Sequence, residues 1–92
     1  MSIANTIKQQ IGNKALYMIG AKNLIATESG LTFKIMRNSK SVSYVKIELN
    51  GADLYDVQYL NGNGKLKTED NDIYFDMLHQ SIEKNTELYT SL

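Results

Sequence analysis

A dense basic cluster is the part of this sequence whose residue types could do chemistry on a partner. Three cations, Lys34, Arg37 and Lys40, fall within seven residues, and Asn38 and Ser39 lie between them. Such side chains contact nucleic-acid backbones, because cations neutralise phosphates while amides and hydroxyls donate hydrogen bonds to the phosphate oxygens. A solvated hairpin tip has the same composition, so the cluster predicts either a phosphate-contacting loop or an ordinary polar turn.

Basic and aromatic side chains also alternate with apolar ones on both sides of this loop. Thr32 and Lys34 share one face of a predicted strand, and Tyr44 and Lys46 share the outward face of the next. If these strands are neighbours, their outer surface presents cations beside an aromatic ring, which suits phosphate contact and base stacking. The alternative is a solvated sheet face whose charges serve solubility. The candidate residues for binding a partner or RNA are Lys22, Asn23, Lys34, Arg37, Asn38, Lys40, Tyr44 and Lys46.

An acidic set near the C-terminus could form a second binding surface. Asp72, Asp76, Glu83 and Glu87 have a spacing that predicts one strip along a C-terminal helix. Such a strip could imitate DNA phosphates or dock on a basic protein, and it is also what a plain solvated helix face presents. We keep these four residues as an alternative protein-binding face.

The two sets reflect a division of charge along the chain. Residues 1–46 carry seven cations and one carboxylate, a net charge of +6, whereas residues 47–92 carry three cations and nine carboxylates, a net charge of −6. The total of zero therefore hides a basic half and an acidic half. This asymmetry makes oppositely charged surfaces possible, and such surfaces guide encounters with charged partners.

Motifs for catalysis or metal binding are weak. The glycines of the segment 62–65 are followed by a lysine, but a phosphate-binding loop needs four residues between its glycines, so we predict a hairpin turn. The carboxylates Glu69, Asp70 and Asp72 could suggest a calcium site, but the segment after them lacks the central glycine of a calcium loop, so helix capping fits these residues better. His79 is the only histidine and there is no cysteine, so we predict a boundary residue within the last helix. We expect no enzymatic activity, metal, cofactor or small-molecule substrate.

Hydrophobic periodicity predicts the elements that position these residues. Isoleucines at positions 3, 7 and 11 predict a helix over residues 3–11, capped by Ser2 and ended by Gly12. The apolar run 15–19 suggests a brief strand, and residues 21–30 show no clear pattern and are expected to form a loop.

The rest of the chain predicts a sheet followed by a helix. Alternation predicts strands over residues 31–35, 44–49 and 54–60, and the turn 61–64 leads into a short edge strand over 65–67. Apolar spacing from residue 73 onward predicts the last helix, with Asp70 or Asn71 as its cap. We therefore expect an α+β fold in which an N-terminal and a C-terminal helix pack on one face of a small antiparallel sheet of about four strands.

Length and hydropathy limit the organisation of the chain. Its 92 residues are enough for a single domain, 1–92, and too few for two. No stretch approaches the roughly 20 apolar residues that span a bilayer, and the first residues lack the apolar run of a secretory signal. We therefore expect a cytoplasmic protein without membrane contact.

Several short segments together resemble a known family. They are Gly20-Ala21-Lys22-Asn23, Leu31-Thr32-Phe33, Val45-Lys46-Ile47-Glu48-Leu49-Asn50, Asp53 with Tyr55-Asp56-Val57, and Leu88-Tyr89-Thr90-Ser91-Leu92. This pattern covers nearly the whole chain and resembles small phage and mobile-element proteins, in particular anti-CRISPR proteins of the type I-F class. The motifs are structural and transfer no contact residues onto numbered positions.

The resemblance implies a function without catalysis. It implies an inhibitor that acts in the host bacterial cytoplasm, binds the crRNA-guided type I-F surveillance (Csy) complex and blocks target-DNA hybridisation by occlusion. Its partners would be Cas proteins, with the crRNA as a further candidate contact. The alternative is a small nucleic-acid-binding module of a phage or mobile element that uses the basic strand and loop, although such modules tend to be basic overall.

Overall fold

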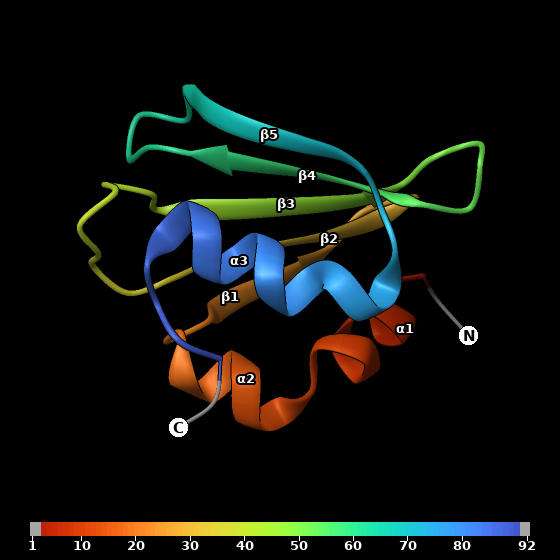
Figure 1. Cartoon of the computed structure of the whole chain (residues 1–92), viewed down its shortest axis with the longest axis horizontal. Helices are drawn as coiled ribbons and strands as arrows, with labels where there is room; N and C mark the ends of the chain where they lie inside the picture. The colour runs from red at the N-terminus through yellow and green to blue at the C-terminus, as the bar shows by residue number, and fades with distance from the viewer. Residues whose placement is uncertain (1–2, 91–92) are drawn as a thin grey trace.

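In a computed structural model that describes residues 3–90, a five-stranded antiparallel sheet forms the frame of the molecule (Figure 1). Each strand pairs with its neighbour in the sequence, because short connections turn the chain straight back on itself. Ser2, the predicted cap of the first helix, lies outside the described residues. The strands are β1 (Lys22–Ala26), β2 (Gly30–Lys34), β3 (Tyr44–Leu49), β4 (Tyr55–Leu60) and β5 (Leu66–Ile73).

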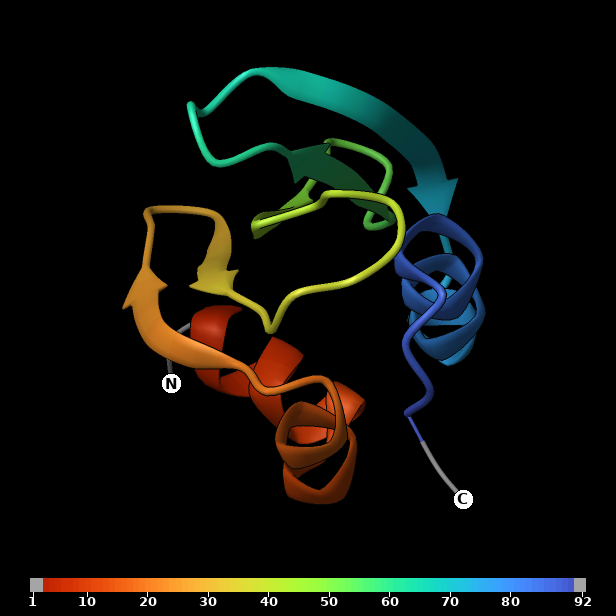
Figure 2. The same ribbon diagram turned by 90° about the vertical axis from the view of Figure 1, so that its left-hand side faces the viewer.

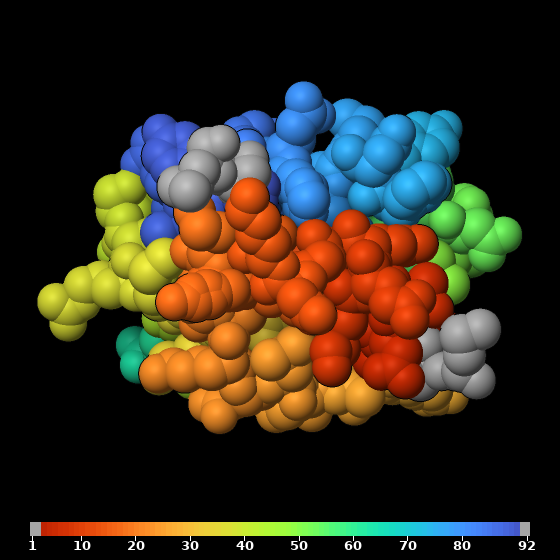
Figure 3. Space-filling model, turned by 90° about the horizontal axis from the view of Figure 1, so that it is seen from below, coloured from red at the N-terminus to blue at the C-terminus, as the bar shows by residue number. Residues whose placement is uncertain are grey.

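The helices lie on the concave side of the curved sheet (Figure 2). Gly12 has a φ of +90° and separates the first two helices, so the first helix ends where the sequence predicts. Seen from the helical side, α1 and α2 lie beside α3 and cover much of this side of the molecule (Figure 3). The helices are α1 (Ile3–Ile11), α2 (Asn13–Met18) and α3 (Leu78–Thr86), and one 3₁₀ turn, η1 (Phe75–Met77), precedes α3.

Strict alternation in β2, β3 and β4 decides which face of the sheet meets the helices. Every second residue is buried along most of each strand, although Gly30 is buried next to Leu31 and Leu49 is only half-buried, and the buried set packs against apolar residues of α1 and α3. Burying each large apolar side chain contributes about 1.5–3 kcal/mol to the stability of the fold. The alternate residues point to the outer face. The central buried side chains are Leu31, Phe33, Val45, Ile47, Val57, Tyr59, Ile7, Ile11, Leu78 and Ile82.

The predicted α+β class is confirmed, with five strands rather than about four. The strand predicted over residues 15–19 is wrong, because Ala15, Leu16 and Ile19 form one buried stripe and most of this run belongs to α2. The loop predicted over residues 21–30 is also wrong, because it contains β1. All five β1 side chains are exposed, so no alternation of apolar and polar residues reveals this edge strand.

The last helix begins later than predicted. Residues 70–73 pair with β4 as part of β5, so neither Asp70 nor Asn71 caps a helix. The Asp70 carboxylate instead accepts hydrogen bonds from side chains of α3. The edge strand predicted over residues 65–67 is therefore present but much longer, because pairing with β4 outweighs the local preference of acidic residues for helix starts.

Candidate nucleic-acid interface

One line of cross-strand partners on the outer face brings several predicted binding residues together. Lys22 pairs with Lys34, and Lys34 pairs with Tyr44. The line continues through Leu60 to Leu66. Directly opposed residues have Cβ atoms about 5 Å apart, so two ammonium groups and an aromatic ring share one strip. The pairing confirms that the strands carrying Lys34 and Tyr44 are neighbours, and we call Lys22, Lys34 and Tyr44 the basic row.

Lys46 lies on the same face but contributes less free charge. It belongs to the next line of partners, opposite Thr32 and Gln58. Its Nζ lies 3.9 Å from an oxygen of Glu48, two residues along the strand. This carboxylate partly compensates the Lys46 charge, so the strongest positive potential is expected at the basic row.

Asn23 lies at an irregularity of the edge strand. Its φ of +54° falls in the left-handed region, which asparagine tolerates better than most residues, and the β1–β2 register shifts between Lys22 and Ile25. Asn23 lines a shallow hollow together with Lys34 and Tyr44. The structure therefore places this predicted residue beside the basic row.

Asn38 holds the loop 35–43 in shape. Its Oδ1 accepts a hydrogen bond from the Val42 nitrogen at 3.1 Å, and its Nδ2 donates to the carbonyl oxygens of Met36 and Val42 at 2.9 and 2.7 Å. These bonds occupy the amide group that we expected to contact a partner. Asn38 is thus a positioning residue for the loop that carries Arg37, which is exposed.

A hollow of about 600 Å³ opens where this loop meets the turn between β4 and β5. Lys34 and Arg37 supply two cations to it, and hydroxyl and amide groups supply further hydrogen-bond donors. Among the described residues that line it, none is acidic, so the hollow suits a phosphate group. Its polar lining comprises Lys34, Arg37, Asn38, Ser41, Ser43, Asn61 and Asn63.

Lys40 lies apart from this hollow. It lines a smaller one, of about 240 Å³, together with Lys67 of β5 and Lys84 of α3. Sequence reasoning missed Lys67 and Lys84 as partners of Lys40 because they lie far along the chain, in its acidic half. Lys84 is also 3.5 Å from an Asp70 oxygen, so part of its charge is compensated.

The topology gathers cations at one end of the sheet. The β2–β3 loop and the β4–β5 turn lie at the same end, on the left in Figure 1, because successive antiparallel strands reverse direction. β1 begins there and α3 ends there. Three lysines from the acidic half of the sequence thus join those of the basic half. We call this the basic end, and it carries Lys22, Lys34, Arg37, Lys40, Lys65, Lys67 and Lys84.

The opposite end of the sheet collects carboxylates. It contains the β1–β2 turn, the β3–β4 loop and the connection from β5 to α3. Glu28, the single carboxylate of the first 46 residues, lies in the first of these segments. The charges are therefore also divided along the strand direction, and this division takes residues from both halves of the sequence. We call this the acidic end, and it carries Glu28, Glu48, Asp53, Asp56, Asp72 and Asp76.

The acidic strip predicted along the last helix does not form. Asp72 belongs to β5, Asp76 to η1 and Glu83 to α3, and Glu87 follows the helix with a φ of +59°. Glu87 is a carboxylate near the basic end, where it accepts a hydrogen bond from Ser39. Asp72 and Asp76 are the members of the set that remain at the acidic end.

Glu83 is engaged by the C-terminal segment. Its Oε2 accepts hydrogen bonds from the backbone nitrogen and the hydroxyl of Thr90, at 3.0 and 2.8 Å. These bonds lower the pKa of Glu83 below its usual value. Glu83 therefore holds residues after α3 against the helix.

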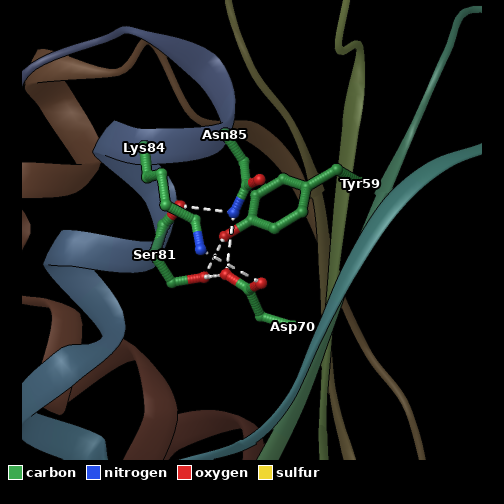
Figure 4. A network of polar contacts seen from close by, with 5 residues as sticks. All are labelled: Tyr59, Asp70, Ser81, Lys84 and Asn85. Carbon is green, nitrogen blue, oxygen red and sulfur yellow. Dashed lines mark hydrogen bonds and ion pairs between the residues drawn. The ribbon is translucent and has the colours of Figure 1, made fainter.

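A polar network beneath α3 competes with the basic end as a candidate site (Figure 4). Ser81 Oγ donates to an Asp70 oxygen at 2.7 Å, so its single hydrogen is used and the Tyr59 hydroxyl must donate to Ser81, also at 2.7 Å. Asn85 donates to the same Asp70 oxygen at 2.8 Å. Ser81 is buried, and the Asp70 carboxylate that accepts its hydrogen has a lowered pKa and is therefore a weak base, so this network anchors α3 to β4 and β5 instead of activating a nucleophile.

The network also sets the charge state of its members. Partial burial raises the pKa of Asp70, but hydrogen bonds from Ser81 and Asn85 and the charge of Lys84 outweigh it, so this pKa lies below its usual value. Burial raises the pKa of Tyr59 well above its ordinary range. At neutral pH the network therefore contains an ionised Asp70 and a neutral Tyr59, as its donors and acceptors require.

His79 makes a structural contact. It is exposed in the first turn of α3 rather than in the middle of a helix, and its Nε2 lies 2.7 Å from the Ile11 carbonyl oxygen. Donation from Nε2 links α3 to α1. Across residues 3–90, no group of three or more His, Asp or Glu side chains could hold a metal ion.

The chain matches no family model, and no curated protein or solved structure is significantly similar to it. The helices described between residues 3 and 90 are all too short or too polar to cross a membrane.

Proposed function

We propose that this chain is a non-catalytic binding protein whose basic end contacts the phosphate backbone of a nucleic acid. The observation that carries the proposal is the basic row, in which Lys22, Lys34 and Tyr44 are consecutive cross-strand partners on an uncovered sheet face. The two ammonium groups would attract phosphates independently of sequence, and the tyrosine ring would offer a stacking surface for a base.

The resemblance to type I-F anti-CRISPR proteins makes the Csy complex the first partner to test. A guide RNA bound to Cas proteins exposes phosphates and must pair with target DNA to act. A domain seated on that RNA through the basic row would block hybridisation by occlusion. The proposal places this inhibitor in the host bacterial cytoplasm.

A second candidate function is that of a free-standing nucleic-acid-binding module. The observation that favours it is the pair of basic hollows at one end, one containing Lys34 and Arg37 and the other Lys40, Lys67 and Lys84. The cations of both hollows could contact successive phosphates of a nucleic-acid strand that is not bound to another protein. Such a module would bind naked RNA or DNA.

One experiment separates the two functions. The purified chain is mixed with Csy complex and target-DNA binding is measured, and in parallel the chain is titrated with naked RNA and single-stranded DNA over a salt series. Loss of target binding at stoichiometric protein, with weak naked binding, supports the inhibitor. Naked binding that falls steeply with salt supports the module. Unimpaired target binding at excess protein overturns the inhibitor, and absence of both effects overturns the nucleic-acid proposal.

A further inference from the structure

An exposed aromatic segment lies at the acidic end, far from the basic row. Tyr74 is 60% exposed, Phe75 59% and Met77 42%, so three large apolar side chains within four residues meet solvent. Contiguous apolar groups on a surface mark interaction sites, and aromatic residues and methionine are enriched in the centres of protein interfaces. We call these three residues the aromatic segment.

A braced bend presents this segment. Asp72 has a φ of +56°, and its backbone nitrogen donates to an Asp56 oxygen at 3.1 Å. Its own carboxylate accepts a hydrogen bond from Asn50 at 2.9 Å. After the bend, the Met77 nitrogen donates to the Tyr74 carbonyl at 2.8 Å. The segment is thus held in place before binding, which lowers the entropy lost when a partner docks.

The charge around the segment selects the kind of partner. Between residues 68 and 83 the chain carries five carboxylates and no lysine or arginine. Asp76 follows Phe75 directly, and Asp72 precedes Tyr74 by two residues. This surface would repel a nucleic acid and attract a cationic protein segment.

A hollow next to the segment offers room for an apolar anchor. It has a volume of about 380 Å³, lies between β5 and α3, and is lined by Ile73 and Met77 together with polar residues. Asp70 and Lys84 also line it and pair with each other. An aliphatic or aromatic side chain could therefore contact Ile73 and Met77 while neighbouring cations face Asp72 and Asp76.

We propose that the acidic end docks a basic segment of a partner protein, with one apolar side chain of that segment packed on Ile73 and Met77, next to the exposed Tyr74 and Phe75. This goes beyond the nucleic-acid contact, because it uses the opposite end of the sheet and leaves the basic row free. A second copy of this chain also has a basic end, but that head-to-tail contact would join copies into a ring or an open chain and would cover the basic row. A different protein is therefore the proposed occupant.

Synthetic peptides test the proposal on the full chain. One peptide set carries a central leucine or phenylalanine flanked by lysine and arginine, and a matched set carries serine and glutamine instead. Binding is measured by fluorescence anisotropy. We expect the basic set to bind, and Tyr74→Ser and Phe75→Ser each to weaken binding about tenfold or more. Tyr17→Ser is the matched control, since Tyr17 is 78% exposed on α2, and it should bind like wild type.

The outcomes that overturn the proposal are distinct from those that concern nucleic acid. Equal binding of the two peptide sets, no binding of the basic set, or equal weakening by Tyr17→Ser rejects the site. Self-association that Phe75→Ser abolishes, measured by sedimentation, assigns the surface to a second copy and rejects a foreign partner. Circular dichroism confirms that each variant is folded, and Phe75→Ser is expected to keep any nucleic-acid binding of the wild type.

Discussion

Lys34 and Tyr44 are cross-strand partners at the ends of β2 and β3, on the face of the sheet that points away from the helices. Their chain neighbours Phe33 and Val45 are buried on the opposite face, which fixes the outward direction of both side chains. A hydrogen bond of 3.0 Å from the Ile35 nitrogen to the Ser43 oxygen continues the pairing into the loop. The cation and the ring are therefore held side by side by the same pairing that builds the core.

Charge reversal at the basic end should weaken partner binding. We expect the double variant Lys34→Glu and Arg37→Glu to weaken inhibition of the Csy complex, or binding of naked nucleic acid, by tenfold or more, because two phosphate contacts are lost. Each lost contact should also make the binding less dependent on salt. The fold should survive because neither side chain belongs to the core. Target-DNA binding and a salt titration measure the effect.

The matched control reverses two exposed cations of the helical layer. Lys8→Glu and Lys14→Glu change the net charge by the same amount but lie on α1 and α2. Full activity of the Lys34 and Arg37 variant, or equal losses in both double variants, would mean that the basic end is not the binding surface.

The ring of Tyr44 should matter more than its hydroxyl. If a base stacks on it, Tyr44→Ala should cost about 1–3 kcal/mol of binding free energy, whereas Tyr44→Phe should retain most of the affinity. Titration of a fluorescent oligonucleotide, free or in the guide complex, measures both variants. Equal losses for the two would show that the hydroxyl donates a hydrogen bond and that stacking contributes little.

Asp70 should make the stability depend on pH in the acid range. Its pKa is lower in the folded chain than its ordinary value of 3.8, so the ionised carboxylate stabilises the fold above that value and this stability is lost as the pH falls through the folded pKa. We expect Asp70→Asn to lower the unfolding free energy by about 1 kcal/mol at neutral pH, with a smaller difference in acid.

Urea unfolding of wild type and Asp70→Asn over a pH series checks this expectation. Asp76→Asn serves as the control, since it removes an exposed carboxylate outside the network by the same substitution. A difference between wild type and Asp70→Asn that stays constant down to the most acidic condition would contradict the proposed charge state of the network.

Gly30 should tolerate no side chain. A Cβ at this position would lie 1.8 Å from the Ile47 carbonyl oxygen and 2.6 Å from a Glu48 oxygen, so the β2–β3 pairing would have to open. We expect Gly30→Ala to cost about 3 kcal/mol or more, or to prevent folding. Gly51→Ala is the matched control, because no atom lies within 4 Å of its Cβ, and it should change stability by less than about 0.5 kcal/mol. Thermal unfolding compares them, and equal melting temperatures would contradict this packing.

The local pattern of the sequence determined the middle of the fold. Residues 31–35, 44–49 and 54–60 alternate between apolar and polar, and this pattern determines both the strands and the faces that they bury. The short turn that begins at Asn61 leads the next strand back onto β4. The side-chain oxygen of Asn61 stabilises this turn by accepting hydrogen bonds from the backbone nitrogens of Asn63 and Lys65. The outward direction of Lys34 and of Tyr44 on their own strands therefore followed from the chain alone, and the pairing of β2 with β3 then placed them side by side.

Tertiary contacts decided where the edge strands lie and which charged side chains gather at each end of the sheet. β1 is a strand because its backbone pairs with β2, and residues 70–73 extend β5 because β4 supplies hydrogen bonds that outweigh a helix cap. Lys67 and Lys84 meet Lys40 only because strand reversals return distant segments to the same end. Composition and spacing determined that the chain has a basic and an acidic half. Backbone pairing, which acts over distances that no local pattern covers, brought cations from both halves to one end of the sheet and carboxylates from both halves to the other.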